Sequence, residues 1–522
     1  MALRSSRAIF SLLALAGGLL TVVACGSSET TSSTGNPGSG GTAGTAGTGS
    51  GLGGNGGMLF TETTGDTTGA SSTTGAASSS GTGMMICDPG PTTGPHTWGK
   101  IFGDASDQSG LAIAHDATGN VVVAGAFSGT LAFGAISLVS AGLSDIFVAK
   151  LGPDGAPIWA KSFGDGKNQS ARGVAVDAQG NVVFVGQFVG SVNFGGGSFT
   201  SVGPNFDDAF LVKLGPQGNH IWSKKFGDIN SQVANAVAVG PTGDIAVVGD
   251  FQSTMAFDAV SISTTGAGDT NAFVAVFDSA GTAKWAKGFG DLEAQSTHAV
   301  AFDATGNVLL TGDATGAIDF GQGAQPLVGT QNAWAAKLSA AGSVTWGKLY
   351  GTSKASGEGI AADSGGNVYL TGDHESKIDF GDGVIDNGNG GPNVYVAKLD
   401  PQGKEIWSHT YGDSQSQHAK GLSVDGKGHA VVVGTFSGSI DFGKGKLPNG
   451  GGVDGFVVKL DTLGCGTWQK GFGDTSFQGI SGVSADAAGN VLITGSISGT
   501  SDLGGGPLKA NGQDVVIAKF AP

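Results

Sequence analysis

The stretch Trp98-Gly99-Lys100-Ile101-Phe102-Gly103-Asp104 decides the fold, because variants of it return throughout the chain. Its Trp recurs at intervals of 61 or 63 residues, as Trp159, Trp222, Trp285, Trp346, Trp407 and Trp468. Seven copies at a nearly fixed period indicate a repeat architecture in which each copy is one structural unit. The composition agrees with short strands and tight turns, since 98 of the 522 residues are Gly and only 13% are charged.

The second copy shows what one unit contains. Apolar segments of strand length occupy 173–177, 182–188, 209–214 and 220–226, and turn sequences rich in Gly, Pro, Asn and Asp separate them. No segment of the unit has the periodicity of a helix. Four strands per unit and seven units predict an all-β fold, a seven-bladed β-propeller with four-stranded blades.

The two ends of the repeat region predict how the ring closes. The region begins at 98–102 with a fourth-strand segment that has no third strand before it. It ends at 514–520 with a third-strand segment that has no fourth strand after it. We therefore expect the N-terminal strand 98–102 to complete the last blade by pairing with strand 514–520.

Two further segments recur from unit to unit. One is Val174-Ala175-Val176-Asp177-Ala178-Gln179-Gly180-Asn181-Val182, and the other is Asp145-Ile146-Phe147-Val148-Ala149-Lys150-Leu151. Together with their copies, which span 98–520, they resemble a bacterial seven-bladed propeller repeat often called SBBP. The resemblance implies a propeller in an exported or surface protein. It implies no particular activity.

The first residues have the features of an export signal. Arg4 and Arg7 precede an apolar segment at 9–23, which is short for a membrane span. The segment ends in Val22-Val23-Ala24-Cys25, which resembles the lipobox of bacterial lipoproteins. This resemblance implies that residues 1–24 are a signal peptide and that Cys25 carries a lipid. The alternative is a plain secretory signal with an incidental Cys. We expect an exported protein that is lipid-anchored to the cell envelope, at the outer membrane or cell surface.

Residues 25–95 consist mainly of Gly, Ser, Thr and Ala and show no hydrophobic period. Such a segment buries too little apolar surface to offset the entropy of ordering it, so we predict a flexible tether with a reach of roughly 45 Å. The propeller would then occupy 96–522 as a monomeric head.

Two cysteines remain besides Cys25. Cys87 precedes the first repeat by eleven residues, and Cys465 stands three residues before Trp468. In a closed ring, these positions fall on the same face and one blade apart. An oxidising compartment permits a disulfide, so we predict a Cys87–Cys465 bridge that fastens the tether beside the closure seam.

Several recurring residues have both a structural and a functional interpretation. The Asp-x-x-Gly-Asn sequence is typical of a turn, although its Asp could also ligate calcium; alternating carboxylates are missing, which favours the turn. The seven Trp could be a carbohydrate platform, but their equivalent positions favour packing between blades. Twelve of the 26 Lys and Arg recur beside the Trp or in the third strand, where their stems can pack between blades.

A Gln follows the Asp of the opening stretch by four residues in every unit except the fifth, where Thr352 and Ser356 stand instead. This segment leads into the innermost strand of the next blade. One interpretation is that Asp and Gln satisfy backbone groups of the crossover. The other is a polar ligand ring at the mouth of the central channel, formed by Asp104, Gln108, Asp165, Gln169, Asp228, Gln232, Asp291, Gln295, Asp413, Gln417, Asp474 and Gln478.

The sequence contains no recognisable catalytic or cofactor motif. Its eight His lack metal-ligand spacing, and it has no nucleophile elbow, zinc-protease or phosphate-loop sequence. We therefore predict no metal, no cofactor and no catalytic residue, although a site gathered from several blades would escape such a search. A net charge of −16 also disfavours nucleic acid as a partner.

The function expected from the sequence is binding or scaffolding. A membrane-tethered propeller would present many loops to a protein or glycan partner. The first alternative is an envelope hydrolase or lyase that acts on polysaccharide at the channel mouth, and the second is a mainly structural surface protein. Close carboxylates at the channel would favour the enzyme, and a uniform ring would favour binding or structure.

Overall fold

The computed structural model describes residues 94–264, 266, 269–388 and 390–522. All the strands named below belong to one compact unit. Within the described ranges the secondary structure is β throughout, and none of them contains a helix long and apolar enough to cross a membrane. Signal peptide 1–24, Cys25, Cys87 and tether 25–93 fall outside these ranges, so the expectations about them stay predictions.

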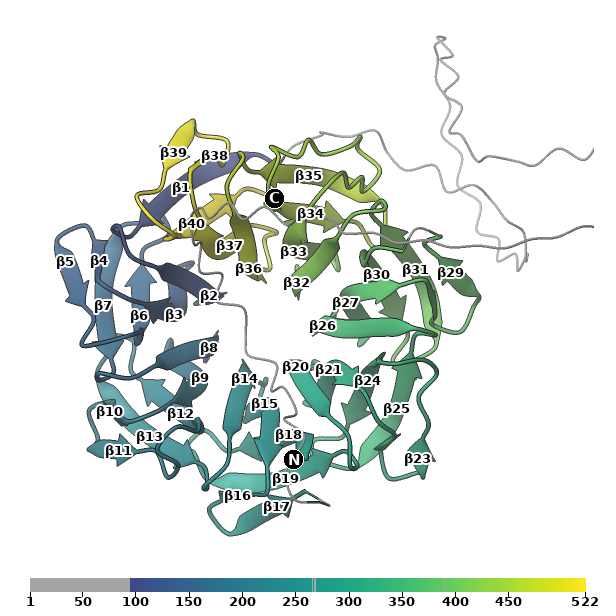
Figure 1. The fold of residues 1–522 in the computed structure, drawn as a ribbon, viewed down its shortest axis with the longest axis horizontal. Coiled ribbons are helices and arrows are strands. Elements are labelled where there is room, and N and C mark those ends of the chain that lie inside the picture. The colour runs from purple at the N-terminus through teal and green to yellow at the C-terminus, as the bar shows by residue number, and fades with distance from the viewer. Residues whose placement is uncertain (1–93, 265, 267–268, 389) are drawn as a thin grey trace, which may run out of the picture. The chain divides into compact units, whose positions relative to one another are not determined.

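Seven antiparallel sheets of four strands surround a central axis (Figure 1). The chain is a seven-bladed β-propeller. Each blade has its innermost strand next to the axis, and these strands are β2 (Gln108–His115), β8 (Gln169–Val176), β14 (Gln232–Val239), β20 (Gln295–Phe302), β26 (Lys354–Ala362), β32 (Gln417–Val424) and β36 (Gln478–Ala485).

The second and third strands of each blade are its buried centre, so they are almost continuously apolar. The second strands are β3 (Val121–Phe127), β9 (Val182–Phe188), β15 (Ile245–Gln252), β21 (Val308–Ala314), β27 (Val368–Glu375), β33 (Ala430–Phe436) and β37 (Val491–Ile497). The third strands are β6 (Asp145–Leu151), β12 (Asp208–Leu214), β18 (Thr270–Phe277), β24 (Asn332–Leu338), β30 (Asn393–Leu399), β34 (Asp454–Leu460) and β40 (Asp514–Phe520).

The outermost strands carry the recurring Trp. They are β7 (Pro157–Phe163), β13 (His220–Phe226), β19 (Ala283–Phe289), β25 (Val344–Tyr350), β31 (Glu405–Tyr411), β35 (Gly466–Phe472) and, in the seventh blade, β1 (His96–Phe102). β1 pairs antiparallel with β40, with Phe102 opposite Val515 and Trp98 opposite Lys519. The predicted closure of the ring is confirmed, and the strand begins two residues earlier than the sequence suggested.

Six blades carry an additional hairpin between their second and third strands, where the sequence predicted only a loop. These hairpins are β4 (Thr130–Phe133) with β5 (Ile136–Val139), β10 (Ser191–Asn193) with β11 (Ser198–Thr200), β16 (Thr254–Phe257) with β17 (Val260–Ser263), β22 (Ile318–Asp319) with β23 (Ala324–Gln325), β28 (Lys377–Asp379) with β29 (Val384–Asp386), and β38 (Thr500–Asp502) with β39 (Pro507–Lys509). Strands of two to four residues are too short for a periodic signal, so the sequence could not reveal them.

Each recurring Trp packs between blades, on a Gly in the turn that precedes the outermost strand of the next blade. A Cβ on that Gly would lie 2.7–3.1 Å from the indole, which leaves no room for a side chain; the seven Gly are Gly94, Gly155, Gly218, Gly281, Gly342, Gly403 and Gly464. In five blades the indole N–H also donates to a carbonyl of that turn, at 2.9–3.2 Å. The recurring Trp residues therefore pack between blades, as the structural interpretation of their equivalent positions predicted.

In five blades the third-strand Lys pairs with the Asp that opens the turn after the innermost strand; the turn sequence is Asp-x-x-Gly-Asn in four of them and Asp-x-x-Gly-His at Asp425. The Nζ–Oδ2 distances are 2.9–3.4 Å, and the pairs are Lys150–Asp116, Lys213–Asp177, Lys337–Asp303, Lys398–Asp363 and Lys459–Asp425. These Asp also accept hydrogen bonds from their own turns, as Asp177 does from Asn181. The turn carboxylates thus serve the fold.

Candidate functional site

The Asp and Gln that follow each outermost strand form a repeated hydrogen-bonded tie. Each Gln is buried, and its Nε2 donates to Oδ1 of the Asp four residues earlier at 2.7–2.8 Å, as in the pairs Gln108–Asp104, Gln169–Asp165, Gln232–Asp228, Gln295–Asp291, Gln417–Asp413 and Gln478–Asp474. In five of them Nε2 also donates to the carbonyl twenty residues later.

The other carboxylate oxygen of each Asp accepts a backbone N–H from the loop after the second strand, at 2.7–3.3 Å. The Asp and Gln side chains thereby satisfy backbone groups of the crossover and of the neighbouring loop. These contacts agree with the interpretation in which Asp and Gln satisfy backbone groups of the crossover, and the amide N–H groups of the Gln are used in them. In the fifth blade the crossover is shorter, and Ala355 stands in place of the Gln.

A different ring of residues varies from blade to blade. In every innermost strand the ladder to the second strand skips one residue, which is a β-bulge. The seven skipped residues all differ, being Leu111, Arg172, Asn235, His298, Glu358, Lys420 and Ser481. A bulge re-aims its side chain, and here it does so on the strand nearest the axis.

A Gly in each second strand makes the bulge possible. A Cβ on this Gly would lie 1.8–2.0 Å from a carbonyl oxygen of the bulged innermost strand, so only Gly fits; the seven are Gly125, Gly186, Gly249, Gly312, Gly372, Gly434 and Gly495. The residue after this Gly also varies between blades, as Ala126, Gln187, Asp250, Asp313, Asp373, Thr435 and Ser496. Both variable positions lie in strands at or next to the axis.

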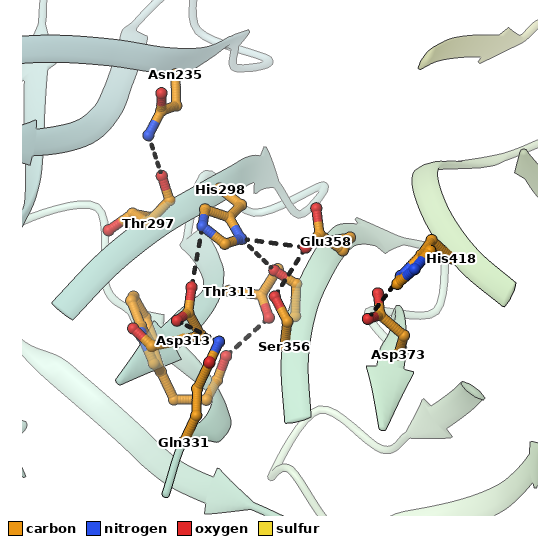
Figure 2. A network of polar contacts seen from close by, with 12 residues as sticks. Asn235, Thr297, His298, Thr311, Asp313, Gln331, Ser356, Glu358, Asp373 and His418 are labelled. Atoms are coloured by element: carbon orange, nitrogen blue, oxygen red, sulfur yellow. Dashed lines mark hydrogen bonds and ion pairs between the residues drawn. The ribbon is translucent and has the colours of Figure 1, made fainter. Parts of the chain in front are cut away.

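Charged residues occupy these two positions on one side of the ring. Figure 2 shows His298 of β20 between Asp313 of β21 and Glu358 of β26. The His298 Nε2 lies 3.0 Å from Oδ1 of Asp313, and its Nδ1 lies 3.7 Å from Oε1 of Glu358. The imidazole also contacts the carbonyl oxygen of Gly357 at 3.1 Å, so it bridges two blades.

The surrounding carboxylates set the charge of this imidazole. Burial lowers the pKa of His298, but the carboxylates of Glu358 and Asp313 outweigh burial and raise the pKa to about 10. Burial raises the pKa of Glu358, but the positive charges of His298 and Lys420 outweigh it and lower the pKa. At neutral pH the pair is therefore an imidazolium held beside a carboxylate.

Two more carboxylates extend the cluster in both directions around the axis. Asp250 accepts from Asn235 at 3.0 Å and from the Thr297 backbone at 3.2 Å. Asp373 lies 3.0 Å from His418, which belongs to the next blade (Figure 2). Burial raises the pKa of both carboxyls, although their hydrogen bonds and nearby His side chains oppose that shift.

We call Asp250, His298, Asp313, Glu358, Asp373, His418 and Lys420 the axial cluster. It spans the third to sixth blades, and Arg172 adds a guanidinium in the second, where its Nε donates to Gln187. The seventh and first blades carry only Ser481, Ser496, Leu111 and Ala126 at the equivalent positions. The axis is thus charged on one side, and in the described part of the chain no group of three potential ligands is arranged to hold a metal ion.

The axial cluster was missed in the sequence because its residues are not repeated. The repeat period reveals residues that recur in most units, such as the Asp and Gln of the tie, and it does not reveal residues that differ from blade to blade. The signal that could have found the cluster is the single Gly in each second strand, which marks a bulge opposite it.

Comparisons with known proteins add little beyond the fold. No protein-family model matches the chain. An uncharacterised WD repeat-containing protein of Acanthamoeba polyphaga mimivirus is 28% identical over 155 residues, which are 27% of this chain. The match spans only 11% of that viral protein's length.

Solved structures include similar arrangements at low identity. A Dyadobacter fermentans protein of unknown function is 12% identical with a TM-score of 0.36, and the match covers 82% of this chain and 97% of that one. The WD40 β-propeller domain of Doa1 is 8% identical with a TM-score of 0.38, covering 82% and 96%. Likenesses of this degree carry no argument about function.

Proposed function

We propose that this chain is an exported, lipid-anchored binding module of the cell envelope whose partner docks at the axial cluster. Propellers commonly serve as protein-interaction scaffolds. The observation that carries the proposal is the unevenness of the bulge positions. The fold needs the same bulge in every blade, and seven different side chains at that position are more than the fold requires.

The anchor rests on the sequence of the first 95 residues. An apolar leader that ends at Cys25 fits a lipoprotein, and the Gly-rich tether would hold the propeller away from the lipid. Labelling with a radioactive fatty acid tests this: the wild-type chain should incorporate label, and a Cys25→Ser variant should not. Labelled Cys25→Ser protein would contradict lipidation at this residue.

The path of the chain into the ring supports the proposed disulfide. Gly94 lies against the indole of Trp468, because a Cβ on Gly94 would be 2.7 Å from that ring. Cys465 precedes Trp468 by three residues and is buried. Seven residues separate Cys87 from Gly94, a reach of about 24 Å, so a Cys87–Cys465 bridge is within range. Peptide mapping without reduction should recover the two cysteines in one linked peptide, and two separately alkylated peptides would refute the bridge.

A second candidate is a polysaccharide hydrolase. Glu358 and Asp373 lie on neighbouring strands of one blade, and their pKa values move in opposite directions, a pattern typical of paired acid and base groups. The candidate predicts release of reducing ends from envelope polysaccharide by the wild-type chain and at least a 100-fold slower release by Glu358→Gln. Equal release by both proteins would exclude this role for Glu358.

The test of the binding proposal compares two variants at equivalent bulge positions. Full-length wild type, His298→Gln and Ser481→Ala are used to enrich partners from solubilised envelopes, with quantitative mass spectrometry and sugar analysis of what is retained. We expect a ligand that wild type and Ser481→Ala retain equally and His298→Gln loses. A ligand retained equally by all three folded proteins would place binding away from the axial cluster.

A further inference from the structure

Large apolar side chains are exposed on one face of the ring. They lie in the loops between second and third strands and in the crossovers between blades, and both kinds of loop belong to the same face. We call the members in the first four blades the apolar arc, which comprises Leu143, Val202, Phe206, Ile229, Leu292 and Val328; Phe477, in the crossover into the seventh blade, is also exposed.

The middle of the apolar arc has no counterpart in the other blades. Ile229 and Leu292 directly follow the Asp of two neighbouring crossovers and are 66% and 70% exposed. At the same position the other full-length crossovers carry Ala105, Gly166, Ser414 and Thr475. The ring does not need large side chains at this position, so their exposure calls for another explanation.

Contacts at glycines show that a second-strand loop and the crossover that follows it meet. A Cβ on Gly203 would lie 3.0 Å from Phe206 and 2.9 Å from the carbonyl oxygen of Ile229. A Cβ on Gly266 would lie 3.0 Å from the Leu292 side chain. The second-strand loop and the following crossover therefore touch in the second blade and again in the third, so Phe206 lies beside the Ile229 segment and the Gly266 loop lies beside Leu292.

The crossovers that carry part of the apolar arc lead directly into the innermost strands that carry the bulge residues of the axial cluster. Each crossover leads into an innermost strand, and the bulge residue comes three residues after that strand begins in most blades. Leu292 thus stands six residues before His298 in the same segment. A partner lying on the arc would contact the axial cluster through a side chain or loop that extends along the axis to the middle of β20.

Charge on this face selects the partner. Four carboxyl groups of the axial cluster come from Asp250, Asp313, Glu358 and Asp373. His298 lies between Asp313 and Glu358, His418 lies 3.0 Å from Asp373, and Lys420 is the third basic residue of the cluster. Asp207 and Glu293 add carboxyl groups directly beside Phe206 and Leu292. An acidic surface repels anionic lipid, and five of the six arc side chains are aliphatic, so Phe206 alone offers a ring face of the kind on which sugars stack.

We propose that the apolar arc docks a segment of a partner protein that carries aliphatic side chains and at least one Lys or Arg, whose cationic end lies over the carboxylates of the axial cluster. The inference rests on the proposed binding function and names the chemistry of its partner. Aliphatic contacts would provide affinity, and the cation would fix the position of the segment along the arc.

Site-specific photocrosslinking in intact cells tests the inference. A photoreactive residue replaces Leu292 or Ile229 in the full-length lipidated chain, and Ile221 serves as the matched control because it is 44% exposed on the outermost strand β13. We expect a protein adduct from both arc positions and none from Ile221. Sequencing of the crosslinked peptide should show aliphatic residues with a net positive charge.

Each other outcome has a separate meaning. An adduct to polysaccharide, to lipid or to an acidic protein segment would overturn the inference and leave the binding proposal standing. No adduct above the Ile221 control would overturn the inference, and the enrichment with His298→Gln would still decide the binding proposal. With the crosslinked segment as a synthetic peptide, Leu292→Ser should weaken binding about tenfold and Ile221→Ser less than twofold. A peptide with its Lys and Arg changed to Gln should bind more weakly at low salt, and unchanged binding would also overturn the inference.

Discussion

The buried Lys–Asp pairs allow a sharp test of what holds a blade together. In the second blade Lys213 Nζ lies 2.9 Å from Asp177 Oδ2, and the two side chains are 7% and 3% exposed. The third blade lacks both partners, because Val276 and Gly240 stand at the equivalent positions. The third blade thus lacks both charges of the pair. Replacing both partners of a buried ion pair destabilises a protein less than removing one, because no charge is then left buried without its partner.

Lys213→Val alone should leave the Asp177 carboxylate buried without its cation. We expect this variant to lose about 3–5 kcal/mol of unfolding free energy. A second variant combines Lys213→Val with the turn sequence of the third blade, so that Gly, Pro, Thr, Gly and Asp stand at 177–181. This change removes the Asp177 carboxylate that would otherwise be buried without a cation. The combined variant should lie within about 1 kcal/mol of wild type, since replacing a whole buried pair by apolar groups is often neutral.

Urea unfolding of the full-length oxidised chain, followed by Trp fluorescence, measures these differences. The control is Lys284→Val, which breaks an ion pair with Asp244 whose side chains are 41% and 19% exposed, and should cost at most about 1 kcal/mol. A loss from Lys213→Val no larger than the control, or losses from Lys213→Val and the turn that simply add, would refute the reasoning.

The same pair has a defined pH dependence. Burial raises the pKa of Asp177, but hydrogen bonds from Asn181 and the Lys213 ammonium outweigh it and lower the pKa below that of the unfolded chain. The stabilisation is therefore present above the unfolded pKa of about 3.9 and is lost as pH falls through the folded pKa. The difference between wild type and Lys213→Val should shrink in acid, and a constant difference would contradict the assignment.

Two further predictions concern single carboxyl groups. Burial raises the pKa of Asp145, so the stabilisation that this carboxyl provides is present below the unfolded pKa and is lost as pH rises through the folded pKa. Asp145→Asn copies Asn271, which stands at the equivalent position of the third blade. The variant should raise the urea midpoint at pH 7 and bring a smaller gain at pH 3. An equal gain at both pH values would count against a titrating carboxyl. Glu358→Gln should lower the pKa of His298 from about 10, as an NMR titration of the imidazole would record, whereas Glu375→Gln on the next strand should not. An unchanged titration in Glu358→Gln would show that Glu358 does not hold the imidazolium.

Much of the fold could be predicted because its causes recur. The Trp at 61- or 63-residue intervals marks the contact between blades, and that contact must be the same each time if the ring is to close. Segments 98–102 and 514–520 each lack a neighbouring strand within their own unit, so each could pair only with the other. The hairpins were missed since strands as short as Ile318–Asp319 have no period to detect, and the innermost strands were predicted too short because their bulges interrupt the alternation.

The candidate site was less predictable for a physical reason. The Asp–Gln tie recurs because each crossover leaves the same backbone groups to satisfy, so repetition there reports on the fold. The axial cluster depends on which side chain stands at each bulge, and a bulge is defined by pairing between strands rather than by local sequence. His298 and Glu358 are sixty residues apart in the chain, and only the closed ring brings them into contact.

A comparison of equivalent positions therefore separates residues that the fold requires from residues that the fold leaves free to vary. Where all blades agree, as at the bulge Gly, a Cβ would collide with the backbone and no other residue fits. Where they disagree, the same bulge accommodates Leu111, Glu358 or Ser481, so the bulge itself does not select the side chain. Charged bulge residues and the central residues of the apolar arc, Ile229 and Leu292, both fall on this second kind of position, and the cluster and the arc overlap in the third and fourth blades. That coincidence is the reason to search for one partner that touches both.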